Sequence, residues 1–227
     1  MKYIYSVLAM LAGAGTVMGQ QAEKKIDSSY ANSYYVGRME IFRTLPVQKG
    51  AIVFLGNSIT ERAQWGELLP GKAIVNRGIG GDNSFGVLAR LDTILLTKPA
   101  KLFIDIGIND LGRGLPVVVI ANNYERILQR VKTLSPKTKV FAQSVLPLNE
   151  AVLKAEYLKN KKALIIELNE RIRSLATQYG ATYVDLHNAV FADEHGDLKQ
   201  PLTVDGIHLA PKAYVLWVDY LKSKKYL

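Results

Sequence analysis

The chain has 227 residues, of which 48% are hydrophobic and 22% are charged, with a net charge of +9 and no cysteine. This length and composition predict one folded domain with a substantial core, and they exclude a disordered or collagen-like chain, disulfide bonds and thiolate chemistry. The positive charge does not by itself indicate a nucleic-acid partner, because the lysines are dispersed and the chain has no recognisable nucleic-acid-binding module.

The N-terminus has the order of a secretory signal peptide. Lys2 precedes an apolar stretch over residues 4–17, which ends in small residues. The pattern predicts a signal peptide over residues 1–20, with cleavage near Gly19 or Gln20, and therefore an exported protein, periplasmic or secreted. An uncleaved anchor is the alternative, but the stretch is short for a span of about 20 residues, and the mature chain has no other candidate. Polar residues 21–33 predict a flexible lead-in, which leaves residues 34–227 as a single domain.

Apolar runs alternate with helical patterns along residues 34–227. Five strands buried on both faces are expected, each bounded by polar or turn residues. Helices are expected where apolar residues recur at helical spacing, and Pro211 suits the first turn of the last one. This alternation predicts an α/β protein with a parallel sheet, whose ligands bind at the carboxyl ends of the strands. The expected strands are residues 51–55, 72–76, 101–107, 138–145 and 181–186, and the expected helices are residues 84–96, 117–134, 151–179 and 211–222.

Ser58 follows the first expected strand, in the sequence FLGNSITE over residues 54–61. It is either the N-cap of the next helix, as most serines in this setting are, or a nucleophile at the end of the strand. A serine hydroxyl is a weak nucleophile at neutral pH and needs a base, such as a histidine, within hydrogen-bond reach.

Three histidines are candidates for that base. Asp205 and His208, in the sequence TVDGIHLAP, are three residues apart, so in a turn the carboxylate can hold imidazole Nδ1 and leave Nε2 free. His187 and His195 also have acidic neighbours in the sequence, and spacing alone does not choose among the three.

Two further segments follow expected strands. The glycine-rich stretch NRGIGGDNSFG, residues 76–86, is no dinucleotide fingerprint, because Asn83 stands where the third glycine is required. It is either a tight turn or a place where a backbone N–H faces a bound oxygen. Asn109 is either a turn residue or an amide donor to an oxyanion. No metal site is expected, since the chain has three histidines, no cysteine and no HExxH motif.

Four short blocks, in this order, resemble those of the SGNH (GDSL-type) hydrolase family: GNSIT (56–60), GIGGD (78–82), GIND (107–110) and DGIH (205–208). Around the middle blocks, the sequences NRGIGGD (76–82) and RLDTILLTKPAKLFIDIGIND (90–110) are similar to those of the platelet-activating-factor acetylhydrolase-like and carbohydrate acetylesterase branch. The resemblance implies a flavodoxin-like three-layer α/β/α sandwich with a five-stranded parallel sheet.

The resemblance also implies a role for each matching residue. Ser58 matches the nucleophile, His208 the general base and Asp205 the residue that orients His208. The backbone N–H groups of Ser58 and Gly81 and the side-chain amide of Asn109 match the oxyanion donors. No cofactor and no metal are implied.

The implied activity is that of a serine esterase acting through an acyl-enzyme. We expect short acyl groups, such as O-acetyl groups on carbohydrate. The expected export and the resemblance to acetylesterases favour them, and the chain has no long hydrophobic insertion that could form a lipid-binding lid. A lipid-directed acylhydrolase or lysophospholipase of the same family is one alternative, and a non-catalytic glycan-binding module on this fold is another. One departure stands out: Asn57 occupies the position where the family usually has Asp, which keeps a polar acceptor for the turn and removes a charge.

Overall fold

The structure is a computed structural model that describes residues 26–227, so the expected signal peptide and residues 21–25 of the expected lead-in lie outside the described residues. Residues 26–32 contain no helix or strand. They are nevertheless held against the domain, because the carbonyl oxygen of Ser29 accepts hydrogen bonds from Asn83 Nδ2 at 2.8 Å and from an Nη of Arg113 at 2.6 Å. The helix α1 (Ser33–Thr44) follows, in a segment whose sequence pattern predicts no helix.

Five parallel strands form a single sheet, in the order β2-β1-β3-β4-β5. This is the flavodoxin-like strand order, so the predicted fold class is confirmed. Every predicted strand overlaps an observed one, although the bounds differ at the ends. The strands are β1 (Ile52–Gly56), β2 (Ile74–Gly78), β3 (Lys101–Asp105), β4 (Lys139–Gln143) and β5 (Thr182–Val184).

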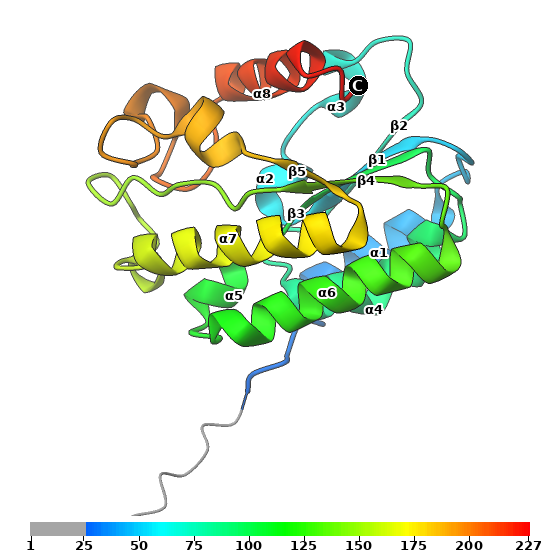
Figure 1. Cartoon of the computed structure of the whole chain (residues 1–227), viewed down its shortest axis with the longest axis horizontal. Helices are drawn as coiled ribbons and strands as arrows, with labels where there is room; N and C mark the ends of the chain where they lie inside the picture. Colours follow the sequence, from blue (N-terminus) through cyan, green and yellow to red (C-terminus); the bar gives the residue numbers. More distant parts are fainter. Residues whose placement is uncertain (1–25) are drawn as a thin grey trace, which may run out of the picture.

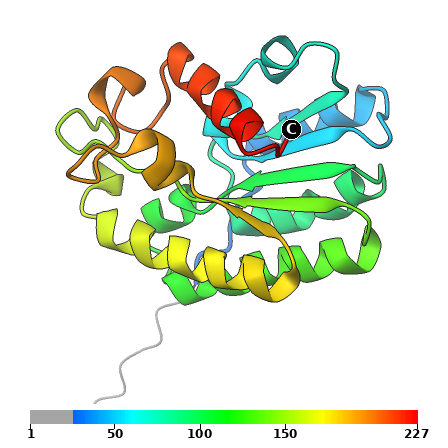
Figure 2. The same ribbon diagram turned by 45° about the horizontal axis from the view of Figure 1, so that its top comes forward.

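Helices cover both faces of the sheet (Figures 1 and 2). The connection from β1 to β2 runs in one direction along the sheet and the later connections run in the other. Because such crossovers are right-handed, their helices lie on opposite faces. One face carries α1, α4 (Ser84–Leu95), α6 (Val117–Leu134) and α7 (Lys162–Tyr179), and the other carries α2 (Ser58–Glu61), α3 (Trp65–Leu68) and α8 (Pro211–Ser223), while the short α5 (Ile108–Gly112) follows β3.

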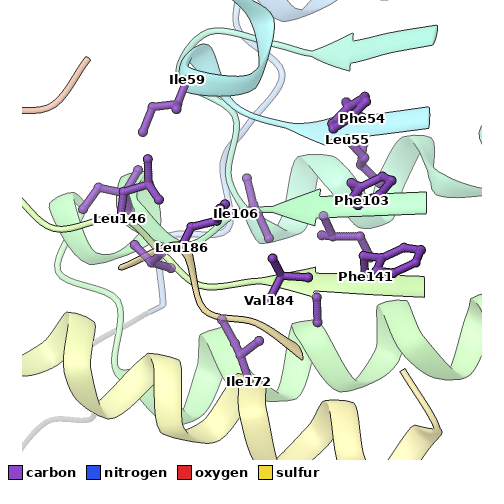
Figure 3. Packing of buried hydrophobic residues seen from close by; sticks show 14 of the residues in the cluster. Phe54, Leu55, Ile59, Phe103, Ile106, Phe141, Leu146, Ile172, Val184 and Leu186 are labelled. Atoms are coloured by element: carbon purple, nitrogen blue, oxygen red, sulfur yellow. The ribbon is translucent and has the colours of Figure 1, made fainter. Parts of the chain in front are cut away.

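A row of aromatic rings crosses the centre of the sheet. Phe54, Phe103 and Phe141 are in register on β1, β3 and β4, with ring centroids 4.8 and 4.4 Å apart (Figure 3). Trp65 of α3 stacks on Phe54 at 3.7 Å, and Trp217 of α8 meets Trp65 edge-on at 5.3 Å. Such large buried rings dominate core energetics. They fix α3, which follows Ser58 in the chain, and α8, which follows His208, on the same face of the sheet.

The helix expected over residues 151–179 is shorter than predicted and begins at Lys162. The backbone N–H of Lys154, which a continuous helix would use internally, donates instead to the carbonyl oxygen of Asp205 at 3.1 Å. Gly206 permits this close approach, since a Cβ there would lie 2.5 Å from Leu153 Cα. Residues 151–161 therefore form a loop that packs against the turn carrying Asp205, with one short 3₁₀ turn, η1 (Glu156–Leu158).

Candidate active site

The candidate site lies where the strand order reverses, between β1 and β3. Open α/β sheets bind ligands at this position, outside the carboxyl ends of the strands. Ser58 follows β1, Gly81 follows β2 and Asn109 follows β3. The topology therefore brings three of the predicted site residues to one edge of the sheet.

Ser58, His208 and Asp205 form a continuous hydrogen-bonded chain. Ser58 Oγ lies 2.9 Å from His208 Nε2, and His208 Nδ1 lies 2.7 Å from Asp205 Oδ2. Because an ionised carboxylate only accepts hydrogen bonds, His208 Nδ1 carries the proton and Nε2 is left to accept from the Ser58 hydroxyl. This is the order of contacts that a serine nucleophile, its base and an orienting acid require.

The turn that carries Asp205 also holds its carboxylate in place. Asp205 Oδ1 accepts hydrogen bonds from the backbone N–H groups of Ile207 at 3.2 Å and of His208 at 2.8 Å. Burial raises the pKa of the Asp205 carboxyl, but the hydrogen bonds from the His208 ring and from these two N–H groups outweigh it and hold the pKa below its ordinary value. Asp205 is therefore ionised at neutral pH, as an orienting acid must be.

The other two histidines have different surroundings. His187 is buried, its Nδ1 lies 3.1 Å from the carbonyl oxygen of Val145, and burial lowers its pKa. The His195 side chain is 76% exposed and lies 3.8 Å from Glu194. The imidazole that contacts Ser58 is that of His208, which spacing alone did not determine.

Asn57, and not Ser58, is the N-cap of α2. Its Oδ1 accepts a hydrogen bond from the backbone N–H of Ile59 at 2.9 Å, so Asn57 has the acceptor role expected of it. Ser58 is then the first helical residue, whose N–H has no acceptor inside the helix. No residue in the described part of the chain accepts from the Ser58 N–H, which leaves it available to a ligand.

Gly81 is the third residue of a turn closed by a hydrogen bond from the Asp82 N–H to the Ile79 carbonyl oxygen at 3.1 Å. Its φ of +74° is the left-handed conformation that the third residue of a type II turn requires, and that glycine adopts at no steric cost. Within residues 26–227, the Gly81 N–H has no acceptor. A second donor therefore stands unpaired beside the end of β1.

Asn109 supplies a third donor. Its Nδ2 donates one hydrogen to the carbonyl oxygen of Asp82 at 2.8 Å, which fixes the amide against the turn of Gly81. An amide has two N–H bonds, so the second remains for another acceptor. Three N–H donors of this kind can stabilise the oxyanion that forms on a carbonyl oxygen when a serine hydroxyl attacks an ester.

A buried ion pair between two residues outside the predicted site supports this turn. Arg90 and Asp82 form the pair at 2.8 Å, with side chains 1% and 0% exposed. Arg90 also donates to the carbonyl oxygens of Arg77 at 2.7 Å and Gly56 at 3.0 Å. One guanidinium therefore connects the ends of β1 and β2 to the turn that carries Gly81. No sequence signal distinguishes this arginine from the charged residues usual on a helix surface.

Asp110 connects α5, the short helix that also carries Asn109, to the start of α4. Its Oδ1 accepts from the backbone N–H of Ser84 at 3.0 Å and from the Ser84 hydroxyl at 2.5 Å. Burial raises the pKa of Asp110 to about 6, and the hydrogen bonds from Ser84 partly offset this effect. Asp110 therefore holds the segment after β2, which carries Gly81, against the segment after β3, which carries Asn109.

In the part of the chain that the structure describes, no three His, Asp or Glu side chains gather in a way that could hold a metal ion. None of the helices over residues 26–227 has the length and hydropathy needed to cross a membrane.

Comparisons with known proteins agree with this architecture. The profile of the GDSL-like Lipase/Acylhydrolase family matches residues 54–216. Platelet-activating factor acetylhydrolase IB subunit alpha2 of Gallus gallus is 29% identical over 169 residues, which cover 72% of this chain and 70% of that protein. GDSL esterase/lipase WDL1 of Oryza sativa subsp. japonica is 29% identical over 195 residues, which cover 74% of each. The crystal structure of a GDSL-like lipase from Bacteroides thetaiotaomicron is 25% identical, with a TM-score of 0.73 over 85% of this chain and 98% of that one.

Proposed function

Because the chain belongs to the GDSL-like lipase/acylhydrolase family, whose members hydrolyse ester bonds, we propose that it is a serine esterase that removes short acyl groups through an acyl-enzyme. The observation that carries this proposal is the 2.9 Å contact between Ser58 Oγ and His208 Nε2. A hydroxyl held against an imidazole that is itself oriented by a carboxylate is an activated nucleophile.

In the proposed mechanism, Ser58 Oγ attacks the ester carbonyl carbon while His208 Nε2 takes the hydroxyl proton. Asp205 keeps the imidazole in the required tautomer and stabilises the imidazolium. The negative charge that develops on the carbonyl oxygen is stabilised by the N–H groups of Ser58, Gly81 and Asn109. His208 then protonates the leaving alcohol, and a water molecule, activated by His208 in the same way, hydrolyses the acyl-enzyme.

We further propose that the acyl group is acetyl and that the alcohol is a carbohydrate hydroxyl. The name of the acetylhydrolase relative supports the first part, and the resemblance of residues 76–82 and 90–110 to carbohydrate acetylesterases supports the second. An apolar-lined cavity of about 190 Å³ lies between α1 and α4, but Ser58 and His208 do not line it. That cavity is therefore not placed to receive a long acyl chain from the ester.

The test is hydrolysis of an aryl acetate by the purified protein and by its Ser58→Ala variant. We expect the variant to lose activity by at least about 10³-fold, because no nucleophile remains. Ser174→Ala is the matched control, since Ser174 is exposed on α7 and its hydroxyl donates to the carbonyl oxygen of Glu170 in the same helix. Full activity in Ser58→Ala would show that the nucleophile is wrongly assigned.

A series of aryl esters of increasing chain length separates the short-chain esterase from a lipid-directed acylhydrolase. Highest kcat/KM on acetate supports the proposal, whereas a maximum at long chains contradicts it. Binding to a glycan without hydrolysis, and without labelling by a serine-directed phosphonate, would favour the non-catalytic module. Release of acetate from O-acetylated xylan fragments would identify the alcohol as a carbohydrate hydroxyl.

We also propose that residues 1–20 are removed on export and that residues 34–227 act as the single catalytic domain. The mass of the protein recovered from the periplasm or medium tests this. Cleavage near Gly19 or Gln20 is the expected result, and an intact N-terminus in the membrane fraction would contradict it.

A further inference from the structure

Glu61, at the end of α2, lies between helix α1 and the turn that carries Gly81. Its Oε2 accepts a hydrogen bond from the backbone N–H of Gly80 at 2.7 Å. Its Oε1 accepts a hydrogen bond from the Tyr34 hydroxyl at 2.9 Å and forms an ion pair with Arg38 Nε at 2.8 Å. Both carboxylate oxygens are therefore engaged, one by the turn and the other by α1.

The contacts of Glu61 restrict its side chain to one conformation. Its side chain is only 15% exposed, and hydrogen bonds to a carboxylate are roughly twice as strong as those between neutral groups. Gly80 allows this close packing, because a Cβ there would lie 3.1 Å from Glu61 Oε2 and 3.2 Å from Tyr34 Cε1.

Helix α1 is itself anchored to the domain. Tyr35 is buried, and its hydroxyl donates to the carbonyl oxygen of Gly86 in α4 at 2.9 Å. Asn32 caps the start of the helix by accepting from the Tyr35 N–H at 2.9 Å. The Tyr34 and Arg38 side chains are therefore presented to Glu61 from a fixed element.

The turn needs such an external anchor. Two consecutive glycines, Gly80 and Gly81, can adopt many backbone conformations, and only some of them direct the Gly81 N–H toward a bound oxygen. An oxyanion donor is effective when it is already oriented before the reaction, so that no reorganisation is needed. The Asp82 to Ile79 hydrogen bond closes the turn from within, and Glu61 holds it from outside.

We propose that Glu61 is a positioning residue for the Gly81 oxyanion donor, and that Tyr34 and Arg38 of α1 hold Glu61 in that role. This inference rests on the proposed esterase function. It adds that a helix outside the residues matched by the family profile helps to position an oxyanion donor. Helix α1 precedes residues 54–216, which the family profile covers.

The decisive variants are Glu61→Ala, Glu61→Gln and Tyr34→Phe, with Glu40→Ala as the matched control. Glu40 is exposed on the same helix, α1, and has no part in the contacts described. For each variant the measurements are kcat and KM on an aryl acetate, the affinity for a boronic acid that forms a tetrahedral adduct with the nucleophile, and the Tm.

We expect Glu61→Ala to lower kcat by about 10- to 100-fold, which is a part of the roughly 10²- to 10³-fold effect of removing one oxyanion donor. Affinity for the boronic acid should fall by a similar factor, with little change in KM, because the donor acts on the tetrahedral state. Glu61→Gln keeps an acceptor for Gly80 and should restore part of the loss. Tyr34→Phe should have a smaller effect, and none in the Glu61→Ala background.

The outcomes separate this inference from the proposed function. An active wild type whose Glu61→Ala variant keeps its kcat and its boronic acid affinity overturns the inference alone, and so does a variant that loses only Tm. An inactive wild type that no phosphonate labels overturns the proposed function and this inference with it. If Glu61→Ala does not fold, Glu61→Gln and Tyr34→Phe decide in the same way.

Discussion

The turn that orients the Gly81 N–H, a proposed oxyanion donor, has a positive φ at this residue, which makes Gly81→Ala an informative substitution. A Cβ added at Gly81 would meet no heavy atom within 4 Å, so the change introduces no clash. Its cost is conformational, because a non-glycine residue at a φ of +74° is less stable by about 1–2 kcal/mol. Relaxation to a negative φ would convert the turn toward type I and rotate the Gly81 N–H away from the proposed position of the oxyanion.

We therefore expect two separate effects of Gly81→Ala. Urea denaturation should show a loss of about 1–2 kcal/mol in the free energy of unfolding, from the strained residue. Steady-state kinetics on an aryl acetate should show kcat lowered by about 10²- to 10³-fold, from the lost donor, with KM changing much less.

Gly50→Ala is the matched control. Gly50 has a φ of +70° and, like Gly81, has no heavy atom within 4 Å of an added Cβ. It precedes β1 at the amino end of the sheet, away from Ser58. This variant should lose similar stability and keep its kcat. A Gly81→Ala enzyme with normal kcat, or a Gly50→Ala enzyme as slow as Gly81→Ala, would refute the reasoning.

Two other side chains give predictions of different kinds. Asp205→Asn should lower kcat by about 10³- to 10⁴-fold, since an amide no longer selects the His208 tautomer with a free Nε2, and a kcat within tenfold of wild type would contradict this. Asp105 is buried at the end of β3, where burial raises its pKa from 3.8 to about 7, and no described residue hydrogen-bonds its Oδ2. Because the folded state then binds the proton more tightly than the unfolded state, the stability that this group contributes is complete below about pH 4 and is lost as the pH rises through 7. Asp105→Asn should therefore weaken the pH dependence of stability, and an unchanged difference in urea unfolding between pH 5 and pH 8 would refute the assignment.

The sheet could be predicted from the sequence because its strands are buried on both faces and appear as short apolar runs. The carboxyl-end rule then placed Ser58 and Asn109 at one edge. Helix α1 could not be found in this way. Among its residues only Tyr35 is buried, while Val36 and Ile41 are 45% and 47% exposed, so no apolar stripe marks it. Contacts made through Tyr34, Tyr35 and Arg38 hold this helix, and a periodicity analysis does not detect them.

The choice of histidine shows a similar limit. Asp185 precedes His187 closely in the sequence, much as Asp205 precedes His208, so local spacing does not separate the two histidines. What distinguishes them is a contact across 150 residues, from His208 Nε2 to Ser58 Oγ. Spacing describes only local geometry, whereas a catalytic contact depends on how α8 and the loop before it pack on the sheet.

Asn57 acquires a physical explanation from the start of α2. One acceptor is enough to cap the helix, and Asn57 Oδ1 supplies it to the Ile59 N–H. The side chain is fully buried, and Nδ2 has no partner among the described residues, so a carboxylate here would place its second oxygen where no described donor meets it. Burying an unpaired charge is costly. The neutral amide keeps the cap and adds no negative charge beside the Ser58 N–H, where the oxyanion would form. Asparagine at this position is therefore compatible with an active oxyanion hole.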